Sequence, residues 1–123
     1  MKSTTKALVV ALEGPVEPEL RRVAEQSALP VLEATDADEA FREIARIRPP
    51  AVVVQVSALV REAVKLIRLV ASAARPVPVI AAATAHQDTV EQAVRDAGAT
   101  CYLPNSEISL LGQVLAALVP QEA

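Results

Sequence analysis

Aromatic residues and cysteine are nearly absent from this chain of 123 residues. It contains one phenylalanine, one tyrosine, no tryptophan, one cysteine and one histidine. Base-stacking surfaces for nucleic acid use several aromatic side chains, and structural zinc sites use several cysteine or histidine ligands. The one cysteine, Cys101, has no histidine or basic neighbour in the sequence to activate its thiol, so we expect it to pack as a small apolar side chain. The composition thus argues against a base-stacking site, a disulfide scaffold and a zinc centre.

An excess of positive charge and a long apolar run are also lacking. The formal net charge is −3, and no basic stripe is present of the kind that binds phosphate backbones. Hydrophobic residues make up 52% of the chain, yet none of their runs approaches the roughly 20 residues of a membrane span. Near the amino terminus, Glu13 and Pro15 interrupt the apolar stretch that a signal peptide would need. We therefore expect no nucleic acid, no membrane and a cytoplasmic location.

What the chain does contain is a regular alternation of short apolar runs and amphipathic segments. The runs are rich in Val, Ile, Leu and Ala and are too short for ordinary helices, so they are predicted to be strands. Nearly continuous apolar strands are typical of a parallel sheet that is covered on both faces. The predicted strands are 6–13, 30–35, 51–57, 77–83 and 100–103.

Helices are predicted between the strands from apolar spacing and from terminal signals. Asp36 with Glu39 three residues later has the pattern of a capping box, and Gly98 is placed to end a helix in the left-handed conformation. Ser57 and Ser106 have no base nearby in the sequence and are interpreted as turn or capping residues. The predicted helices are 17–27, 36–48, 58–74, 88–96 and 107–118.

Alternating strands and helices with right-handed crossovers predict a three-layer α/β sandwich. Five strands in so short a chain favour the flavodoxin-like, doubly wound parallel sheet of order 2-1-3-4-5. We expect residues 1–123 to form one domain. In such sheets ligands bind beyond the carboxyl ends of the strands, so function is sought there first.

One segment resembles a known family. Residues 96–105, Asp-Ala-Gly-Ala-Thr-Cys-Tyr-Leu-Pro-Asn, are similar to the Gly-Ala-x-x-Tyr-Leu-x-Lys-Pro stretch of bacterial response-regulator receiver domains. Residues 78–80 resemble the fourth strand of that family, residues 48–54 its third, and residues 7–10 with Glu13 and Pro15 its first. The resemblance covers essentially the whole chain in register, and the joint order of the segments is more specific than any one of them.

The resemblance also implies where the family's phosphorylation residues would lie. Receiver domains use a pair of acids to bind Mg²⁺, an Asp to accept a phosphoryl group, a Thr or Ser to sense it and a Lys to pair with it. At the corresponding positions this chain has Ala11 and Leu12 for the acids, Gln55 for the acceptor, Ala83 for the hydroxyl and Asn105 for the Lys. All of these functional groups are replaced.

The residues that remain are poor substitutes. Thr84 is adjacent to the hydroxyl position, but alternation along a strand would turn it to the opposite face. Glu13 alone is a weak Mg²⁺ site, because that ion is usually held by several oxygen ligands. The Gln55 amide cannot form an acyl phosphate as a carboxylate does. We therefore interpret the pocket as degenerate, with no metal, no cofactor and no enzymatic activity.

Two other residues, Tyr102 and His86, could have a chemical role but have simpler interpretations. Tyr102 resembles the switch aromatic of receivers, although half-buried packing is an equally good explanation. His86 precedes the predicted fourth helix with only Asp88 nearby as a co-ligand, so we expect an exposed loop residue rather than a metal ligand.

The predicted fifth helix carries more apolar residues than one sheet face requires. Ile108, Leu111, Leu115 and Leu118 suffice to cover the sheet, and a second apolar stripe follows at helical spacing. In receivers the face made of the fourth helix, fifth strand and fifth helix is the usual dimer and partner surface. The candidate interaction residues are Tyr102, Leu110, Val114 and Ala117. The alternative is that an Ala-, Val- and Leu-rich chain simply tolerates some exposed apolar residues.

Two functional hypotheses follow. The first is a pseudo-receiver that does not depend on phosphorylation and serves bacterial signalling or localisation by binding a protein partner, with a homodimer through the same face. The second is a small flavodoxin-like domain that binds a small molecule in a neutral pocket around Glu13, Gln55, Ser57 and Asn105. Glu13-Gly14-Pro15 does not favour a phosphate-bearing ligand, because Pro15 removes a backbone donor.

Overall fold

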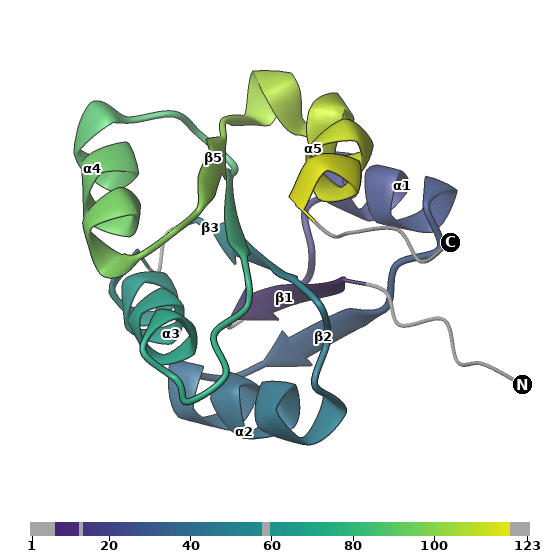
Figure 1. Cartoon of the computed structure of the whole chain (residues 1–123). Coiled ribbons are helices and arrows are strands. Elements are labelled where there is room, and N and C mark those ends of the chain that lie inside the picture. The colour runs from purple at the N-terminus through teal and green to yellow at the C-terminus, as the bar shows by residue number, and fades with distance from the viewer. Residues whose placement is uncertain (1–6, 13, 58–59, 119–123) are drawn as a thin grey trace, which may run out of the picture.

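A computed structural model describes residues 7–12, 14–57 and 60–118 of the chain. In these residues strands and helices alternate as the sequence predicts (Figure 1). The strands are β1 (Leu8–Leu12), β2 (Val31–Ala34), β3 (Val52–Val56), β4 (Val79–Ala83) and β5 (Cys101–Leu103). The helices are α1 (Pro18–Gln26), α2 (Ala37–Ile47), α3 (Val60–Ala71), α4 (Asp88–Ala97), the 3₁₀ helix η1 (Asn105–Leu110) and α5 (Leu111–Leu118).

The five strands form one sheet of order β2-β1-β3-β4-β5, and all four pairings are parallel. The predicted flavodoxin-like topology is confirmed. The central strands β1, β3 and β4 are buried along their whole length, which explains their unbroken apolar sequences. The short strand β5 forms one edge of the sheet and pairs with β4, with Ala81 beside Tyr102.

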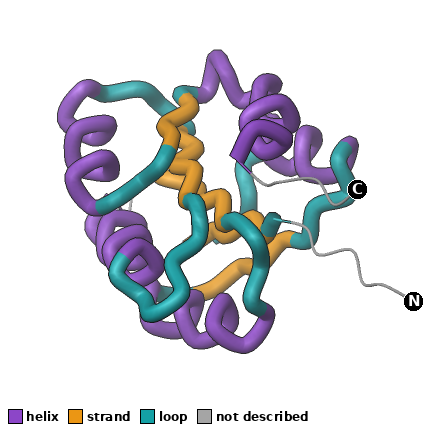
Figure 2. The backbone as a smooth tube through the Cα atoms, viewed as in Figure 1, coloured by secondary structure: helices purple, strands orange, loops and turns teal. Residues whose placement is uncertain are grey.

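Helices cover both faces of the sheet. Figures 1 and 2 show α2, α3 and α4 on one face, and α1, η1 and α5 on the other. Side chains alternate along the strands, so each strand contributes to two separate cores. Val52 and Val54 of β3 belong to the core beneath α2, α3 and α4, whereas Val53 belongs to the core beneath α1 and α5.

Local signals place the ends of α2 and α4 as predicted. The Asp36 carboxylate accepts a hydrogen bond from the Glu39 amide at 2.9 Å, and the Glu39 carboxylate accepts one from the Thr35 amide at 2.8 Å. The pair is similar to a capping box, except that Glu39 accepts from Thr35, the residue before the N-cap Asp36. The hydrogen bonds from the amide and hydroxyl of Thr35 lower the pKa of the Glu39 carboxyl. Helix α4 ends at Gly98, whose φ of 118° lies in the left-handed region.

Two helix boundaries differ from the prediction. Helix α3 ends at Ala71 instead of residue 74, and the Ser72 hydroxyl donates to the Arg68 carbonyl at 2.7 Å. The fifth α-helix begins at Leu111, not at residue 107. The Glu107 amide donates to the carbonyl of Pro104, three residues earlier, at 2.8 Å, and this spacing is that of a 3₁₀ helix. Among the described residues, no helix is both long and apolar enough to cross a membrane.

Candidate functional site

Gln55 is the central residue at the carboxyl end of β3. Its side chain is 5% exposed, and it is the only buried polar side chain among the residues that the structure describes. The Gln55 Oε1 accepts a hydrogen bond from the Glu17 backbone amide at 2.7 Å. The Gln55 Nε2 donates one to the Pro15 carbonyl at 3.3 Å. Both ends of the amide are therefore used to hold the backbone that connects β1 to α1.

A second side chain holds the same connection. The Glu33 carboxylate, at the end of β2, accepts a hydrogen bond from the Val16 amide at 3.4 Å and pairs with Arg21 of α1 at 3.0 Å. The β1–α1 connection is thus tied to the ends of both β2 and β3. Each backbone group satisfied in this way avoids the cost of burial without a partner.

The side chains at Ala11 and Leu12, where the resemblance would place the Mg²⁺-binding acids, carry no ligand atoms. Ala11 and Leu12 end β1 and are 0% and 4% exposed, and Ala83 ends β4 at 1% exposed. Their side chains contribute to the apolar cores. Glu13, the one acidic candidate, lies outside the described residues.

Thr84 lies one residue beyond the end of β4, whose last residue, Ala83, pairs with Val56. The Thr84 amide donates to the Val56 carbonyl at 3.0 Å, and its hydroxyl lies 3.5 Å from the same oxygen. A hydroxyl is therefore present near the carboxyl end of β3. Asn105 is exposed and begins η1, and its side chain bonds no other described residue.

A cavity of about 330 Å³ opens beside the ends of β3 and β4. The polar side chains that line it are uncharged, and of the described residues of the predicted neutral pocket only Ser57 lines it. Gln55 and Asn105 do not line it. The lining residues are Val56, Ser57, Val60, Thr84, Ala85, Gln87 and Val90.

Tyr102 is buried, and its hydroxyl is engaged. The residue is 6% exposed and packs in the core beneath α2, α3 and α4. The Tyr102 hydroxyl and His86 Nδ1 form a hydrogen bond of 2.9 Å, and the centroids of the two rings are 5.7 Å apart. Burial raises the pKa of Tyr102, and the nearby Glu91 and Asp88 carboxylates act in the same direction. The sequence did not predict this contact, because it joins the β4–α4 loop to β5.

His86 is an exposed loop residue, as expected, but it has more neighbours than expected. Its Nε2 lies 3.0 Å from an Asp88 carboxylate oxygen, and ligand atoms of His86, Asp88 and Glu91 lie within 4.8 Å of one another. Helical spacing from Asp88 could have identified Glu91. Acids in the first turn are favoured by the helix dipole, and Glu91 is already paired with Arg95 at 2.9 Å. These interactions explain the cluster without a bound ion.

The second apolar stripe near the carboxyl end is less regular than predicted. Ile108, Leu111 and Leu115 are buried against the sheet. Leu110 is 40% exposed and lies in η1, and Ala117 of α5 is exposed. Val114, by contrast, is half-buried and packs against the core beneath α1 and α5.

Among the described residues, the side chains that end β1, β3 and β4 are uncharged, and the Gln55 amide is already hydrogen-bonded. The site offers no carboxylate from the described residues at the ends of β1, β3 and β4 and no general base beside a nucleophile. A neutral amide in a buried position can position backbone groups but cannot transfer a phosphoryl group.

No protein-family model and no curated protein matches the sequence. Solved structures do match. A LuxR-family response regulator from Aurantimonas is 19% identical, with a TM-score of 0.72 over 94% of this chain and 86% of that one. The receiver domain of a NarL response regulator from Mycobacterium tuberculosis is 18% identical, with a TM-score of 0.70 over 94% and 98%. The chemotaxis regulator CheY4 of Vibrio cholerae is 16% identical, with a TM-score of 0.68 over 90% and 97%. The chain therefore has the fold of response-regulator receiver domains.

Proposed function

We propose that this chain is a pseudo-receiver, a signalling domain that acts in the bacterial cytoplasm by contact and without phosphorylation. The observation that carries the proposal is that the Gln55 side chain, which we assign to the acceptor position, is bonded to Pro15 and Glu17. In a phosphorylatable pocket this position must remain open to the incoming group. Here the Gln55 side chain instead holds the β1–α1 connection, which is a structural role.

The lack of charge supports a non-enzymatic role. An acidic pocket without its lysine would be destabilised by like charges, and the loss of both kinds of residue leaves a neutral site. Ala11, Leu12 and Asn105 provide neither a set of Mg²⁺ ligands nor a cation for a phosphoryl group. Thr84 has no base that could activate its hydroxyl for nucleophilic attack.

The proposed contact surface lies at the β5 edge of the sheet. There α4 covers one face, η1 and α5 cover the other, and β5 is the last strand (Figure 1). Leu110 of η1 and Ala117 of α5 expose apolar side chains, and an interface core favours such groups over charged ones. We propose that a protein partner binds here and that a second copy of the chain can do so.

Replacing Leu110 by Glu together with Ala117 by Lys is expected to abolish self-association. Both side chains are exposed, so the new charges meet water in the monomer but are desolvated in an interface. The measurement is sedimentation velocity beside circular dichroism. Val114 is left unchanged because it packs against the core.

The matched control is Ile47→Glu, because Ile47 is also 40% exposed but lies on α2, away from the β5 edge. It should associate like the wild type. A wild type that stays monomeric at high concentration, or a double variant that associates unchanged, would overturn the proposed self-association.

A small-molecule function is the second candidate, and the cavity of about 330 Å³ near Ser57 and Thr84 is the observation that favours it. Pockets for small ligands typically have about 300–1,000 Å³ and a few polar groups. A ligand that binds only the folded state would raise the melting temperature, and the shift should grow with the logarithm of its concentration above the dissociation constant. A thermal-shift screen would identify such a ligand, and amide NMR shifts at Ser57 and Thr84 would show that it binds in this cavity. A chain that acts only through a contact surface would show neither effect.

A further inference from the structure

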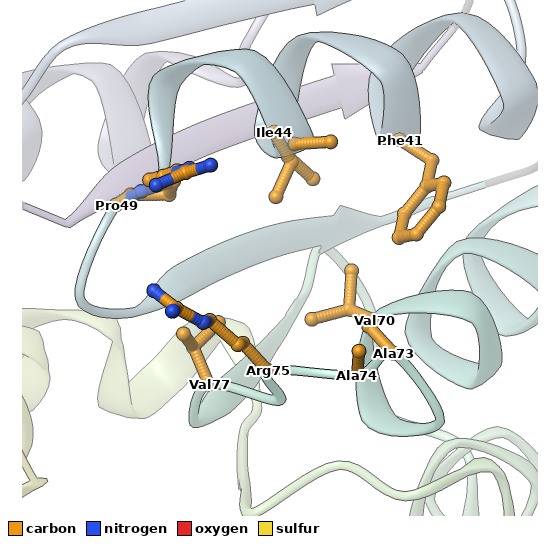
Figure 3. Close-up of a pocket in the computed structure, with 10 residues that line it drawn as sticks. Phe41, Ile44, Pro49, Val70, Ala73, Ala74, Arg75 and Val77 are labelled. Carbon is orange, nitrogen blue, oxygen red and sulfur yellow. The ribbon is translucent and has the colours of Figure 1, made fainter.

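A larger cavity lies between α2 and α3, near the amino-terminal ends of β3 and β4. Gln55 lies at the opposite, carboxyl end of β3. The volume of the cavity is about 510 Å³, and the cavity is bounded by the residues that precede β3 and β4. Figure 3 shows Phe41 and Ile44 pointing from α2 toward Val70 on α3. The residues that line it are Phe41, Ile44, Ala45, Arg48, Pro49, Val70, Ala73, Ala74, Arg75 and Val77.

The cavity combines an apolar interior with two cations. Ile44, Pro49 and Val70 are buried and form its floor, and none of the described residues that line it carries a carboxylate. Arg48 and Arg75 are both exposed, and neither guanidinium has a hydrogen bond or ion pair with any described residue. Such a site favours a ligand that has a negative charge and few other polar groups.

The backbone of Arg48 gives an independent reason to examine this side chain. Arg48 follows the last residue of α2 with φ 56° and ψ 57°, in the left-handed region. Glycine is the usual residue there, and a side chain costs about 1–2 kcal/mol in this conformation. The helix dipole stabilises a cation near the carboxyl end of a helix. An arginine within the last turn of α2 would gain the same stabilisation without a left-handed backbone, so the dipole alone does not explain Arg48.

We propose that this cavity binds a small amphipathic carboxylate, with its apolar body between α2 and α3 and its carboxylate at Arg48 and Arg75. Guanidinium groups bind carboxylates through two parallel hydrogen bonds. A volume of about 510 Å³ is within the range of small-molecule pockets, about 300–1,000 Å³. The apolar lining has no donor or acceptor for a sugar or nucleobase, so a hydrocarbon body fits best.

Decanoate is a suitable probe, and two-dimensional amide NMR of the whole chain is the measurement. Saturable shifts are expected at residues that line the cavity, and decanol, which has the same chain without the charge, should bind far more weakly. Arg48→Gly combined with Arg75→Ala should raise the dissociation constant about 10- to 100-fold, the loss expected for charge-assisted hydrogen bonds. Arg48→Gly also relieves the left-handed backbone, so the variant is expected to fold.

Arg68→Ala is the matched control, because Arg68 is an exposed arginine of α3 that does not line the cavity and has no bonded carboxylate among the described residues. It should bind decanoate like the wild type. The proposal is overturned if decanoate produces no saturable shift, if its shifts map elsewhere, if decanol binds equally well, or if the double variant keeps the wild-type affinity.

Discussion

Replacing Gly98 by alanine is expected to lower the free energy of unfolding by about 2–5 kcal/mol, the sum of a left-handed backbone and an overpacked contact. Gly98 has a φ of 118°, and an added Cβ would lie 2.5 Å from the Cβ of Ala71 at the end of α3. That separation is far below van der Waals contact, and neither backbone can move without disturbing the packing of α3 against α4. Urea unfolding followed by circular dichroism measures the loss.

Gly14→Ala separates the two contributions. Gly14 also has a positive φ, of 140°, but an added Cβ there would meet nothing within 4 Å. Only the backbone cost remains, so this variant should lose less stability than Gly98→Ala. Equal losses in the two variants would show that the contact with Ala71 is unimportant.

Replacing Gln55 by leucine is expected to lower the free energy of unfolding by about 1–3 kcal/mol, because the Glu17 amide and the Pro15 carbonyl lose their partner. The substitution keeps the volume close to that of glutamine and removes both hydrogen bonds. Amide hydrogen exchange gives a local measurement, since the Glu17 amide should lose protection while amides in the central strands keep it. Unchanged protection of the Glu17 amide would contradict the proposed role of Gln55.

Gln55→Glu extends the test with a dependence on pH. Burial raises the pKa of the new carboxyl in the folded state above its unfolded value. The protonated form can donate to the Pro15 carbonyl as the amide does, so the variant should approach the wild type in acid. Its stability relative to the wild type should fall as the pH rises through the folded-state pKa. A difference that is independent of pH would show that the new carboxyl is solvated.

The sequence predicted the elements that depend on local chemistry. Capping at Asp36 and the left-handed end at Gly98 follow from residues within a few positions of the helix end, and the strands follow from their apolar runs. The predicted start of α5 was wrong. An acidic residue such as Glu107 is typical of a first helical turn, but this turn is a 3₁₀ helix that follows Pro104. Both conformations satisfy the same local signals.

The site was less predictable because its contacts are distant in the sequence. Gln55 was identified as a neutral replacement, but its bonds to Pro15 and Glu17 span 40 and 38 residues. The contact between His86 and Tyr102 likewise requires β5 to lie beside β4. The bond from the Thr84 amide to the Val56 carbonyl also joins two strands that are distant in the sequence.

The most direct test of the pseudo-receiver is an intact-mass measurement after incubation with a small acyl phosphate donor and Mg²⁺. We expect no change in mass, since on the proposed correspondence Gln55 is an amide at the acceptor position, and Ala11 and Leu12 supply no metal ligands. Gln55→Asp should also remain unmodified, because Asn105 is the residue proposed for the position of the lysine. A stoichiometric phosphoryl adduct on the wild-type chain, at Thr84 or any other residue, would contradict the account.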